Sequence, residues 1–424
     1  IEAEKNVAPG PAKPVLFAEP KPPSAEPVKE DSTSDEEFSH RVNNDRISKM
    51  LIEAEKDRKK LHEWPSPLSV EACEFATDLL PANGGSKESL RVFACTWNMH
   101  GKGAPSPENL KRILPPNMCH VYVVATQECE VTAQSSVYHL NQLKFPKAVK
   151  ACLGDRYFVV RGQALAAINL TVFAHESIRE DINSHSSDVV ATGLANTFGN
   201  KGGCGISFCV GKTSFLFVGS HMAAHQHKVK ARNRDFSNID KNLNLQRPAG
   251  IVWKIDHENK EEANTVSDRF HYVFWLGDFN YRINGTRKAV DKMLAFRMHA
   301  ALVANDQLLI EKSCGNAFDR FSEGPLNFLP TYKFDKNCDT YDSSKKARIP
   351  SWTDRILWRT NQAPGVLRLL AYDSETSVKM SDHRAVRAVF EAPLNPPTGD
   401  KGMETLRKDR KPFGSESSQI CSIM

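Results

Sequence analysis

The stretch Trp275-Leu276-Gly277-Asp278-Phe279-Asn280-Tyr281-Arg282 connects an apolar run to a cluster of polar side chains. The apolar run, His271–Leu276, is rich in aromatic and branched residues, which is typical of a buried β-strand. The sequence therefore predicts a strand whose end carries Asp278 and Asn280. Because strand ends are rigid supports on which loops build binding and catalytic sites, this stretch predicts a sheet-based fold with a site at one edge.

Polar side chains also adjoin four other apolar runs of the chain. Taken singly, an Asn or Asp at a strand end most often caps a turn, and a lone His is most often a hydrogen-bonded structural residue. Their joint occurrence favours one site built from several strand ends. The residues concerned are Asn98 and His100, Gln127 and Glu128, Ser220 and His221, and Asp382 and His383.

Short apolar runs alternate with turn residues from about residue 90 to 392, and we interpret them as strands. One helix is predicted over Arg287–Asn305, where apolar residues recur on one side. Many strands with intervening helices indicate an α+β fold arranged as a layered α/β sandwich. Besides His271–Leu276, the predicted strands are Arg91–Trp97, Val121–Thr126, Tyr157–Val160, Leu165–Phe173, Gly203–Val210, Ser214–Gly219, Leu367–Tyr372 and Ala385–Phe390.

The composition divides the chain into four parts. Residues 1–37 are rich in Pro, Glu, Lys and Ser, and we expect them to be disordered because they bury too little apolar surface to offset their ordering entropy. Residues 38–87 form a helical lead-in, with a helix predicted over 38–64. Residues 88–392 form the catalytic domain, and residues 393–424 form a flexible basic tail. Since the chain begins with Ile1 rather than Met, we expect further sequence upstream.

The overall composition excludes several classes of protein. Of the 424 residues, 40% are hydrophobic and 25% are charged, as expected for a globular protein, and no apolar run is long enough to span a bilayer. A formal net charge of +5 is too small to indicate a nucleic-acid-binding protein. The ten cysteines form no CxxC pair and no zinc-like cluster, which favours free thiols in a reducing compartment.

Two candidate metal ligands, Glu128 and Asn98, carry oxygen donors. Oxygen ligands without a nearby cysteine suit Mg²⁺ rather than Zn²⁺. Mg²⁺ commonly takes one or two carboxylates and completes its coordination with water and substrate phosphate. The sequence therefore predicts a magnesium site and a phosphorylated substrate.

Five clusters of the chain together resemble motifs of the inositol polyphosphate 5-phosphatases. The two signature motifs of that family look like the GDFNYR and PSWTDRIL stretches here. The resemblance covers about residues 88–392, and the motifs occur in family order. It implies a fold like DNase I and the endonuclease/exonuclease/phosphatase enzymes, with two packed mixed sheets flanked by helices and the site at one end. The clusters are Thr96–Gly101, Ser220–His225, Trp275–Arg282, Pro350–Leu357 and Ser381–Arg384.

The resemblance also implies a role for each matching residue. It places Mg²⁺ at Glu128 and Asn98. Phosphoryl transfer needs alignment and charge neutralisation more than covalent chemistry, so such a set is chemically sufficient. Which group deprotonates the water, and whether one or two metals act, stay open. The catalytic set comprises the water-activating pair Asp278 and Asn280, the imidazole His383, its orienting carboxylate Asp354, whose charge is expected to raise the pKa of His383, and the phosphate-pocket residues His221 and Asp382.

A second set of residues resembles family segments that hold the phosphate next to the one removed. Each ring phosphate carries close to two charges, so several cations are needed. The alternative is that 345–348 is only a solvated loop. The Gly-rich turn 196–203 lacks a nucleotide P-loop pattern, and its Asn200 and Lys201 are secondary candidates. The substrate-binding candidates are Tyr332, Lys333, Lys346, Arg348 and Arg282.

The chain ends in Cys421-Ser422-Ile423-Met424, which fits a C-a-a-X prenylation pattern that favours a farnesyl group on Cys421. Basic residues from Lys401 to Lys411 supply the second signal that lasting membrane attachment needs. With the proline-rich front, this end resembles type IV members of the family. That resemblance implies a peripheral protein of cytoplasmic membrane faces, at the Golgi or primary cilium, that a prenyl-carrier protein escorts.

The sequence as a whole predicts Mg²⁺-dependent removal of the 5-phosphate from phosphoinositides, with the 4,5-bisphosphate and 3,4,5-trisphosphate as substrates. Phosphoinositide lipids are therefore the expected partners, and nucleic acid is not. One alternative is another enzyme on the same scaffold, an endonuclease or a sphingomyelinase. A second is a non-enzymatic interaction protein that recruits SH3-type partners through Pro11–Pro14 and Pro20–Pro23.

Overall fold

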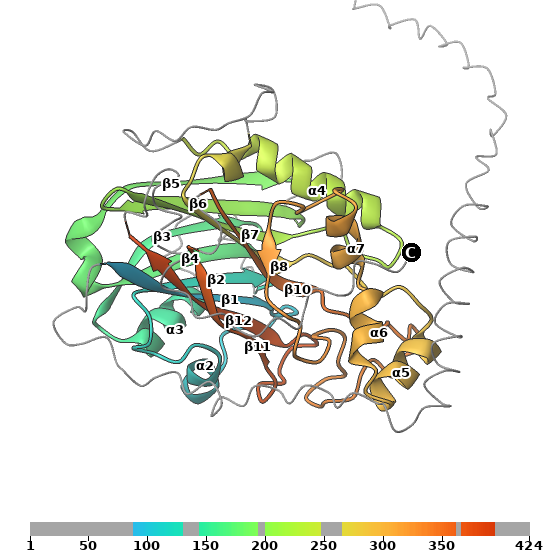
Figure 1. The fold of residues 1–424 in the computed structure, drawn as a ribbon. Helices are drawn as coiled ribbons and strands as arrows, with labels where there is room; N and C mark the ends of the chain where they lie inside the picture. Colours follow the sequence, from blue (N-terminus) through green and yellow to red (C-terminus); the bar gives the residue numbers. More distant parts are fainter. Residues whose placement is uncertain (1–87, 130–143, 194–199, 247–264, 362–365, 395–424) are drawn as a thin grey trace, which may run out of the picture.

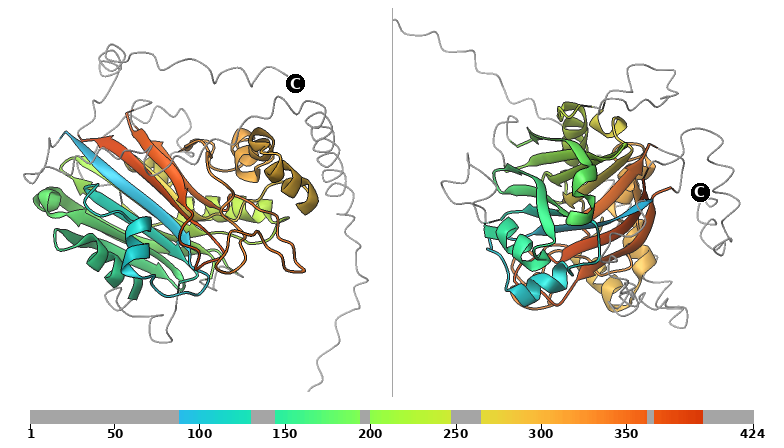
Figure 2. Two further views of the ribbon diagram at one scale, coloured as in Figure 1. Left: turned by 90° about the horizontal axis from the view of Figure 1, so that it is seen from below. Right: turned by 90° about the vertical axis from the view of Figure 1, so that its left-hand side faces the viewer.

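The computed structural model describes residues 88–129, 144–193, 200–246, 265–361 and 366–394. These residues form two six-stranded sheets stacked face to face, with helices on the outer faces and at one end (Figures 1 and 2). This arrangement confirms the predicted layered α+β sandwich. The proline-rich front, the helix predicted over 38–64 and the lipidation candidate Cys421 lie outside the described residues.

The first sheet contains the N-terminal and C-terminal strands of the described chain side by side. Strand β1 pairs in parallel with β2 and antiparallel with β12. In spatial order the strands are β11 (Arg368–Glu375), β12 (Ala385–Pro393), β1 (Ser89–Asn98), β2 (Val121–Gln127), β4 (Ile168–His175) and β3 (Tyr157–Leu165).

The second sheet repeats this plan, because β7 pairs in parallel with β8, and β8 pairs antiparallel with β10. In spatial order the strands are β5 (Ile182–Ala191), β6 (Gly202–Val210), β7 (Thr213–His221), β8 (Tyr272–Asp278), β10 (Asp354–Thr360) and β9 (Ser322–Glu323).

The helices cover the outer faces and one end of the sandwich (Figure 1). None of those in the described ranges is both long and apolar enough to cross a membrane. The α-helices are α2 (Pro107–Ile113), α3 (Lys144–Leu153), α4 (Val229–Asn242), α5 (Arg287–Ala295), α6 (His299–Ala304) and α7 (Gln307–Ser313), and the 3₁₀-helices are η3 (Glu176–Asp181) and η5 (Val266–Asp268).

The strands alternate their side chains between two apolar layers, which explains why most strand residues are buried. In β1, Val92 and Ala94 belong to the core between the sheets, whereas Phe93 and Cys95 pack toward α2 and α3. A third core lies between the second sheet and α4. A strand buried on both faces has to be apolar throughout, so the central strands were readable from the sequence.

Two predicted elements are wrong in their boundaries. The predicted strand Leu165–Phe173 is a hairpin, because β3 ends at Leu165 and β4 begins at Ile168. Ala166, with φ of +48°, occupies the left-handed turn position. Such positions favour Gly or Asn, so the apolar Leu-Ala-Ala-Ile run concealed the turn.

The predicted helix Arg287–Asn305 is also wrong, since it is two helices, α5 and α6. Arg297 has φ of +54°, and Met298 N donates to Met293 O at 2.8 Å, which closes a Schellman-type end. Glycine normally takes that position, so the continuing apolar periodicity hid the break. Three strands were not predicted: the largely polar β5, the two-residue β9, and β10, whose residues were interpreted only as part of a motif.

The pairing pattern brings six strand ends to one end of the sandwich. The carboxyl ends of β1 and β2 lie together, as do those of β7 and β8, because each pair is parallel. The amino ends of β12 and β10 join them, because these strands are antiparallel to β1 and β8. The polar residues that flank these ends are thereby collected in one place.

Candidate active site

Asp278, at the end of β8, is the centre of a buried polar network. Its Oδ2 accepts a hydrogen bond from Asn98 Nδ2 at 2.9 Å and lies 3.3 Å from His221 Nε2. Its Oδ1 accepts the backbone N–H of Asn280 at 3.0 Å. Burial by itself raises the pKa of Asp278, but His221 and nearby positive charges outweigh it and lower the pKa. Asp278 is therefore ionised and holds its neighbours in place.

His383 and Asp354 form a second buried pair beside this network. His383 Nδ1 lies 2.9 Å from Asp354 Oδ2, which also accepts hydrogen bonds from Thr331 at 2.7 Å and Thr353 at 3.0 Å. Burial opposes the charge of His383, but Asp354 and then Asp278 raise its pKa to about 10. The expected rise in the pKa of this imidazole is thus confirmed.

Both pairs meet around a common space, as the sequence predicted. Ligand atoms of Asp278, Asp354 and His383 all lie within 4.8 Å of one another. Among the described residues, Asp354 Oδ1 is buried without a hydrogen-bond partner. Buried polar atoms normally have partners, so this oxygen is available to a water, a cation or a substrate group.

Glu128 and Asn98 lie next to the Asp278 network, through Asn98 Nδ2, which donates to Asp278, and through His221, which lies between Asp278 and Glu128. The Glu128 carboxylate is 45% exposed and lies 3.9 Å from His221 Nε2 and 3.8 Å from His100 Nδ1. Asn98 Oδ1 accepts the backbone N–H of His100 at 3.0 Å. His100 Nδ1 also lies 3.3 Å from Asp382 Oδ1. The sequence analysis noticed His100 in its cluster but gave it no role, since an exposed His has no distinguishing signal.

The donors present fit a hard divalent cation. Glu128 supplies a solvent-open carboxylate, and Asn98 supplies an amide oxygen with a lone pair beyond its bond to His100. Cys129, which follows Glu128 in the described chain, is buried and its Sγ donates to Ala167 O, so its thiol is directed away from a cation. The Asp278–Asp354–His383 group also brings three polar side chains within 4.8 Å of one another, but the raised pKa of His383 makes its imidazole a hydrogen-bond donor rather than a metal ligand. The pair Glu128 and Asn98 offers oxygen donors, as hard cations require.

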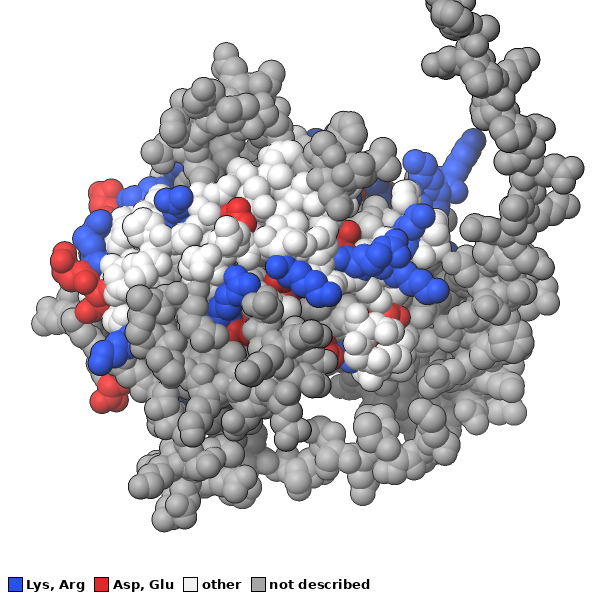
Figure 3. Space-filling model, turned by 90° about the horizontal axis from the view of Figure 1, so that it is seen from above, with Lys and Arg blue, Asp and Glu red and all other residues white. Residues whose placement is uncertain are grey.

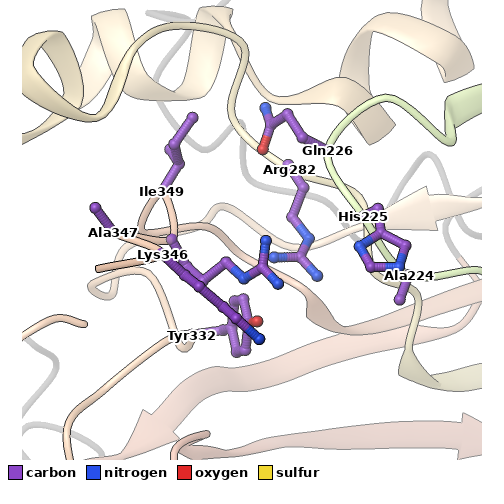
Figure 4. Close-up of a pocket in the computed structure, with 9 residues that line it drawn as sticks. Ala224, His225, Gln226, Arg282, Tyr332, Lys346, Ala347 and Ile349 are labelled. Carbon is purple, nitrogen blue, oxygen red and sulfur yellow. The ribbon is translucent and has the colours of Figure 1, made fainter. Parts of the chain in front are cut away.

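The substrate-binding candidates divide between two hollows that share Lys346. Arg282, Tyr332 and Arg348 line a cavity of about 240 Å³. Figure 4 shows Arg282 and His225 entering it from one side and Lys346 from another, with Tyr332 below. His225 and Gln226 also line it. His225 belongs to the Ser220–His225 cluster of the resemblance but was assigned no role, and Gln226 was not singled out.

Lys333 lies in the other hollow, of about 550 Å³. Its Nζ donates to Asp382 Oδ2 at 3.0 Å. Burial lowers the pKa of Lys333, but the negative charge of Asp382 outweighs burial, so the pKa is raised. Tyr332 joins the smaller hollow to the catalytic pair, because its ring centroid lies 4.5 Å from that of His383 and Arg282 lies 4.4 Å above its face. All five substrate candidates therefore border the site.

Lys201, a secondary candidate, contacts Nε2 of His221 from the start of β6. Burial lowers the pKa of Lys201, and burial together with Lys201 lowers that of His221. His221 is consequently a neutral hydrogen-bonding group rather than a cation. Asn200 is exposed, and residues 194–199 lie outside the described ranges.

Comparison with known proteins identifies the family. A model of the endonuclease/exonuclease/phosphatase family 2 matches residues 95–389. The inositol polyphosphate 5-phosphatase domain of SpSynaptojanin, solved with inositol (1,4)-bisphosphate and a calcium ion, is 32% identical to this chain with a TM-score of 0.60. The match covers 72% of this chain and 85% of that one. The chain belongs to the inositol polyphosphate 5-phosphatase family.

Longer 5-phosphatases match the same region. Synaptojanin of Caenorhabditis elegans is 31% identical over 78% of this chain and 30% of its own length. Phosphatidylinositol polyphosphate 5-phosphatase type IV of Homo sapiens is 33% identical over 73% of this chain and 47% of its own length. The chain therefore spans less than half the length of these relatives. Cimex nitrophorin, 24% identical with a TM-score of 0.55, shares the fold.

The surface charge of this 5-phosphatase is uneven along the sandwich. In the face seen in Figure 3, acidic side chains gather toward the left, whereas a larger group of Lys and Arg side chains extends toward the right. The right is the end toward which β1 and β8 run in Figure 1, with α5, α6 and α7 beyond them. A positive potential at that end attracts polyanionic substrates.

Proposed function

We propose that this chain removes the 5-phosphate from phosphoinositides, the 4,5-bisphosphate and the 3,4,5-trisphosphate, with Mg²⁺ and by in-line attack of water. The observation that carries the proposal is the position of the buried His383–Asp354 pair opposite Asp278 and beside two cation-lined hollows. A polyphosphorylated ring offers one phosphate to the catalytic groups and others to the hollows. Membership of the 5-phosphatase family supports the choice of phosphate.

In the proposed reaction, water attacks phosphorus as the bond from phosphorus to the ring oxygen breaks. The water oxygen stays on the released phosphate, and a proton from the water ends on the ring oxygen. Asp278 and Asn280 orient the water, and His383, protonated near neutral pH, donates a hydrogen bond to a phosphoryl oxygen. Asp354 keeps the imidazole of His383 aimed at that oxygen.

Glu128 and Asn98 are the residues that would hold Mg²⁺. A bound divalent cation supplies positive charge to the phosphoryl oxygens in such reactions. His221 and Asp382 complete the phosphate pocket, since each lies beside two other residues of the site. These contacts let the chain keep the anionic phosphate and several carboxylates close together.

Membrane attachment is a further part of this proposal. A farnesyl group on Cys421, with the basic stretch before it, would hold the catalytic domain at the cytoplasmic membrane face where its lipid substrate is confined. The proposal extends to residence at Golgi or primary-cilium membranes, transport by a prenyl-carrier protein, and SH3-type partners bound by the proline-rich front. In cells, Cys421→Ser should move the protein off membranes without changing its turnover of soluble inositol phosphates.

A panel of phosphoinositide isomers tests the proposed reaction. Purified protein, with Mg²⁺ and with EDTA, is given each isomer, and the released phosphate and the product position are measured. We expect loss of the 5-phosphate only, and only with the cation. A folded Asp278→Asn variant should lose about a thousandfold in turnover. Cleavage of plasmid DNA or of sphingomyelin, without 5-phosphate release, would overturn the proposal in favour of another enzyme on this scaffold.

A further inference from the structure

A buried glutamine, Gln307, ties together two of the walls of the cavity shown in Figure 4, Arg282 and the loop that carries His225 and Gln226. It is the first residue of α7, and only 4% of its surface is exposed. Its Oε1 accepts the backbone N–H of Arg282 at 2.8 Å and the guanidinium of Arg232 at 2.6 Å. Its Nε2 donates to the carbonyl oxygen of Gln226 at 3.1 Å and to Asn284 Oδ1 at 2.9 Å.

The first wall is Arg282, which Gln307 holds at two points. Besides accepting the N–H of Arg282, Gln307 donates its own backbone N–H to Arg282 O at 2.8 Å. The Arg282 guanidinium then bonds Asn280 O at 3.0 Å and Asn280 Oδ1 at 2.5 Å. Gln307 thereby fixes the backbone from which Arg282 reaches both the cavity and Asn280.

The second wall is the loop over residues 223–226, which carries His225. The fully buried Arg232 of α4 donates to the carbonyl oxygens of Ala223 at 3.2 Å, His225 at 2.7 Å and Gln226 at 3.3 Å. Arg232 is in turn bonded to Gln307, so one side chain connects this loop to Arg282. The loop is also held by Ala223 N, which donates to Asp235 Oδ2 at 2.8 Å, and by Gln226 Nε2, which donates to Ile283 O at 2.8 Å.

We infer that Gln307 is a positioning residue that sets the spacing of the cavity walls for a ring phosphate adjacent to the scissile one. The inference rests on the proposed function, because it assumes a polyphosphorylated ring. Gln307 contacts neither His383 nor Asp354, so its loss should move the cavity walls while the catalytic pair stays in place. When the residues that support a binding site become less ordered, the substrate is positioned less accurately while the catalytic groups stay in place.

The test compares inositol 1,4,5-trisphosphate with inositol 1,5-bisphosphate, which lacks the neighbouring phosphate. Gln307→Ala should raise KM for the trisphosphate about tenfold and change KM for the bisphosphate about twofold or less, with kcat nearly unchanged on both. Gln307→Glu keeps an acceptor for Arg282 and Arg232 but cannot donate to Gln226, so it should show a smaller rise. The glutamate variant also covers the case in which the alanine variant fails to fold.

A matched control is Asn361→Ala at the other end of the sandwich. Asn361 Nδ2 donates to the carbonyl oxygens of Ser267 at 2.8 Å and Phe270 at 2.7 Å, so its loss also breaks two buried bonds. It should lower the melting temperature without separating the two substrates. Calorimetric binding of the trisphosphate in EDTA, where no hydrolysis is expected, should weaken about tenfold with Gln307→Ala.

Equal KM changes on both substrates, or none on either, would overturn the role of Gln307. The same holds if Asn361→Ala separates the substrates as Gln307→Ala does. If the unaltered protein hydrolyses neither compound, the proposed function fails and this inference fails with it. If the unaltered protein hydrolyses both and Gln307→Ala matches it, only the inference on Gln307 fails.

Discussion

Two clusters of buried charge occupy neighbouring positions on β10 and are built in opposite ways. Asp354 points toward the active site, where one of its oxygens accepts three hydrogen bonds and the other lacks a partner among the described residues. Arg355 lies on the other face, where it donates to both carboxylate oxygens of Asp306 and of Glu323 at 2.6–2.9 Å.

The difference shows how one strand can serve catalysis and stability at once. In the Arg355 cluster every carboxylate oxygen has a hydrogen-bond partner. The cluster is buried, and it needs no water or ligand to complete its hydrogen bonds. The Asp354 cluster keeps unused hydrogen-bonding capacity beside a cavity. Unsatisfied buried polar atoms are costly, so they persist where a ligand completes them.

The largest effect is expected from removing the imidazole of the open cluster. His383→Ala should lower turnover about a thousandfold, because it removes the hydrogen-bond donor to the phosphoryl oxygen, while the fold stays intact. Phosphate release and circular dichroism are the measurements. His271→Ala is the matched control, because His271 is also buried, bonds Ser214 and lies at the far end of the second sheet. A comparable loss of turnover in both folded variants would show that His383 matters no more for catalysis than an ordinary buried histidine.

The closed cluster should respond in stability instead. Arg355→Met matches the side chain in size but leaves Asp306 and Glu323 buried without a cation, which should cost about 3–5 kcal/mol of the unfolding free energy. Denaturant titration measures this cost. Turnover per folded molecule should fall far less than in His383→Ala. A variant that unfolds at the same denaturant concentration as the unaltered protein would contradict this interpretation of the Arg355 cluster.

The pH dependence of stability separates the two clusters further. His383 has a pKa of about 10 in the folded protein, above the ordinary value of 6.5, so its contribution is complete below about pH 6.5. Between about pH 6.5 and 10 the unfolded state has lost this proton while the folded state keeps it, so the unfolding free energy should fall by up to about 1.4 kcal/mol per pH unit. Denaturation series in EDTA measure this slope, and Asp354→Asn should flatten it. If Asp354→Asn leaves the pH dependence of the unfolding free energy unchanged, titratable groups other than His383 cause the decline.

The smallest effect concerns Lys333 at the rim of the open cluster. Lys333→Ala removes the cation paired with Asp382, and should reduce kcat/KM on a 4,5-bisphosphorylated ring about tenfold. Hydrolysis of a generic soluble phosphate ester should change little, since that ester has no second phosphate. Lys212→Ala, an exposed lysine between β6 and β7 that lines neither hollow, is the matched control. Equal losses of kcat/KM on both substrates would show that Lys333 does not bind the second phosphate.

The sequence predicted the site better than it predicted the loops between strands. Asp278, Asn280, Asp354 and His383 follow or precede apolar runs, and the structure brings them together as expected. The turn at Ala166 and the helix break at Arg297 were missed, because residues with ordinary local preferences adopt left-handed backbone there. Local propensity carries no information when tertiary contacts impose the conformation.

The sequence by itself therefore determined the central strands, the residue types at their ends and the family. Only the tertiary structure decided which cations share a hollow, which oxygen of Asp354 stays unpaired and that Gln307 joins two of the cavity walls. The burial pattern of a strand depends on the residues of that strand alone, so it can be predicted from the local sequence. Partners such as Gln307 and Arg232, 75 residues apart, meet only when the packed sheets bring α4 and α7 together.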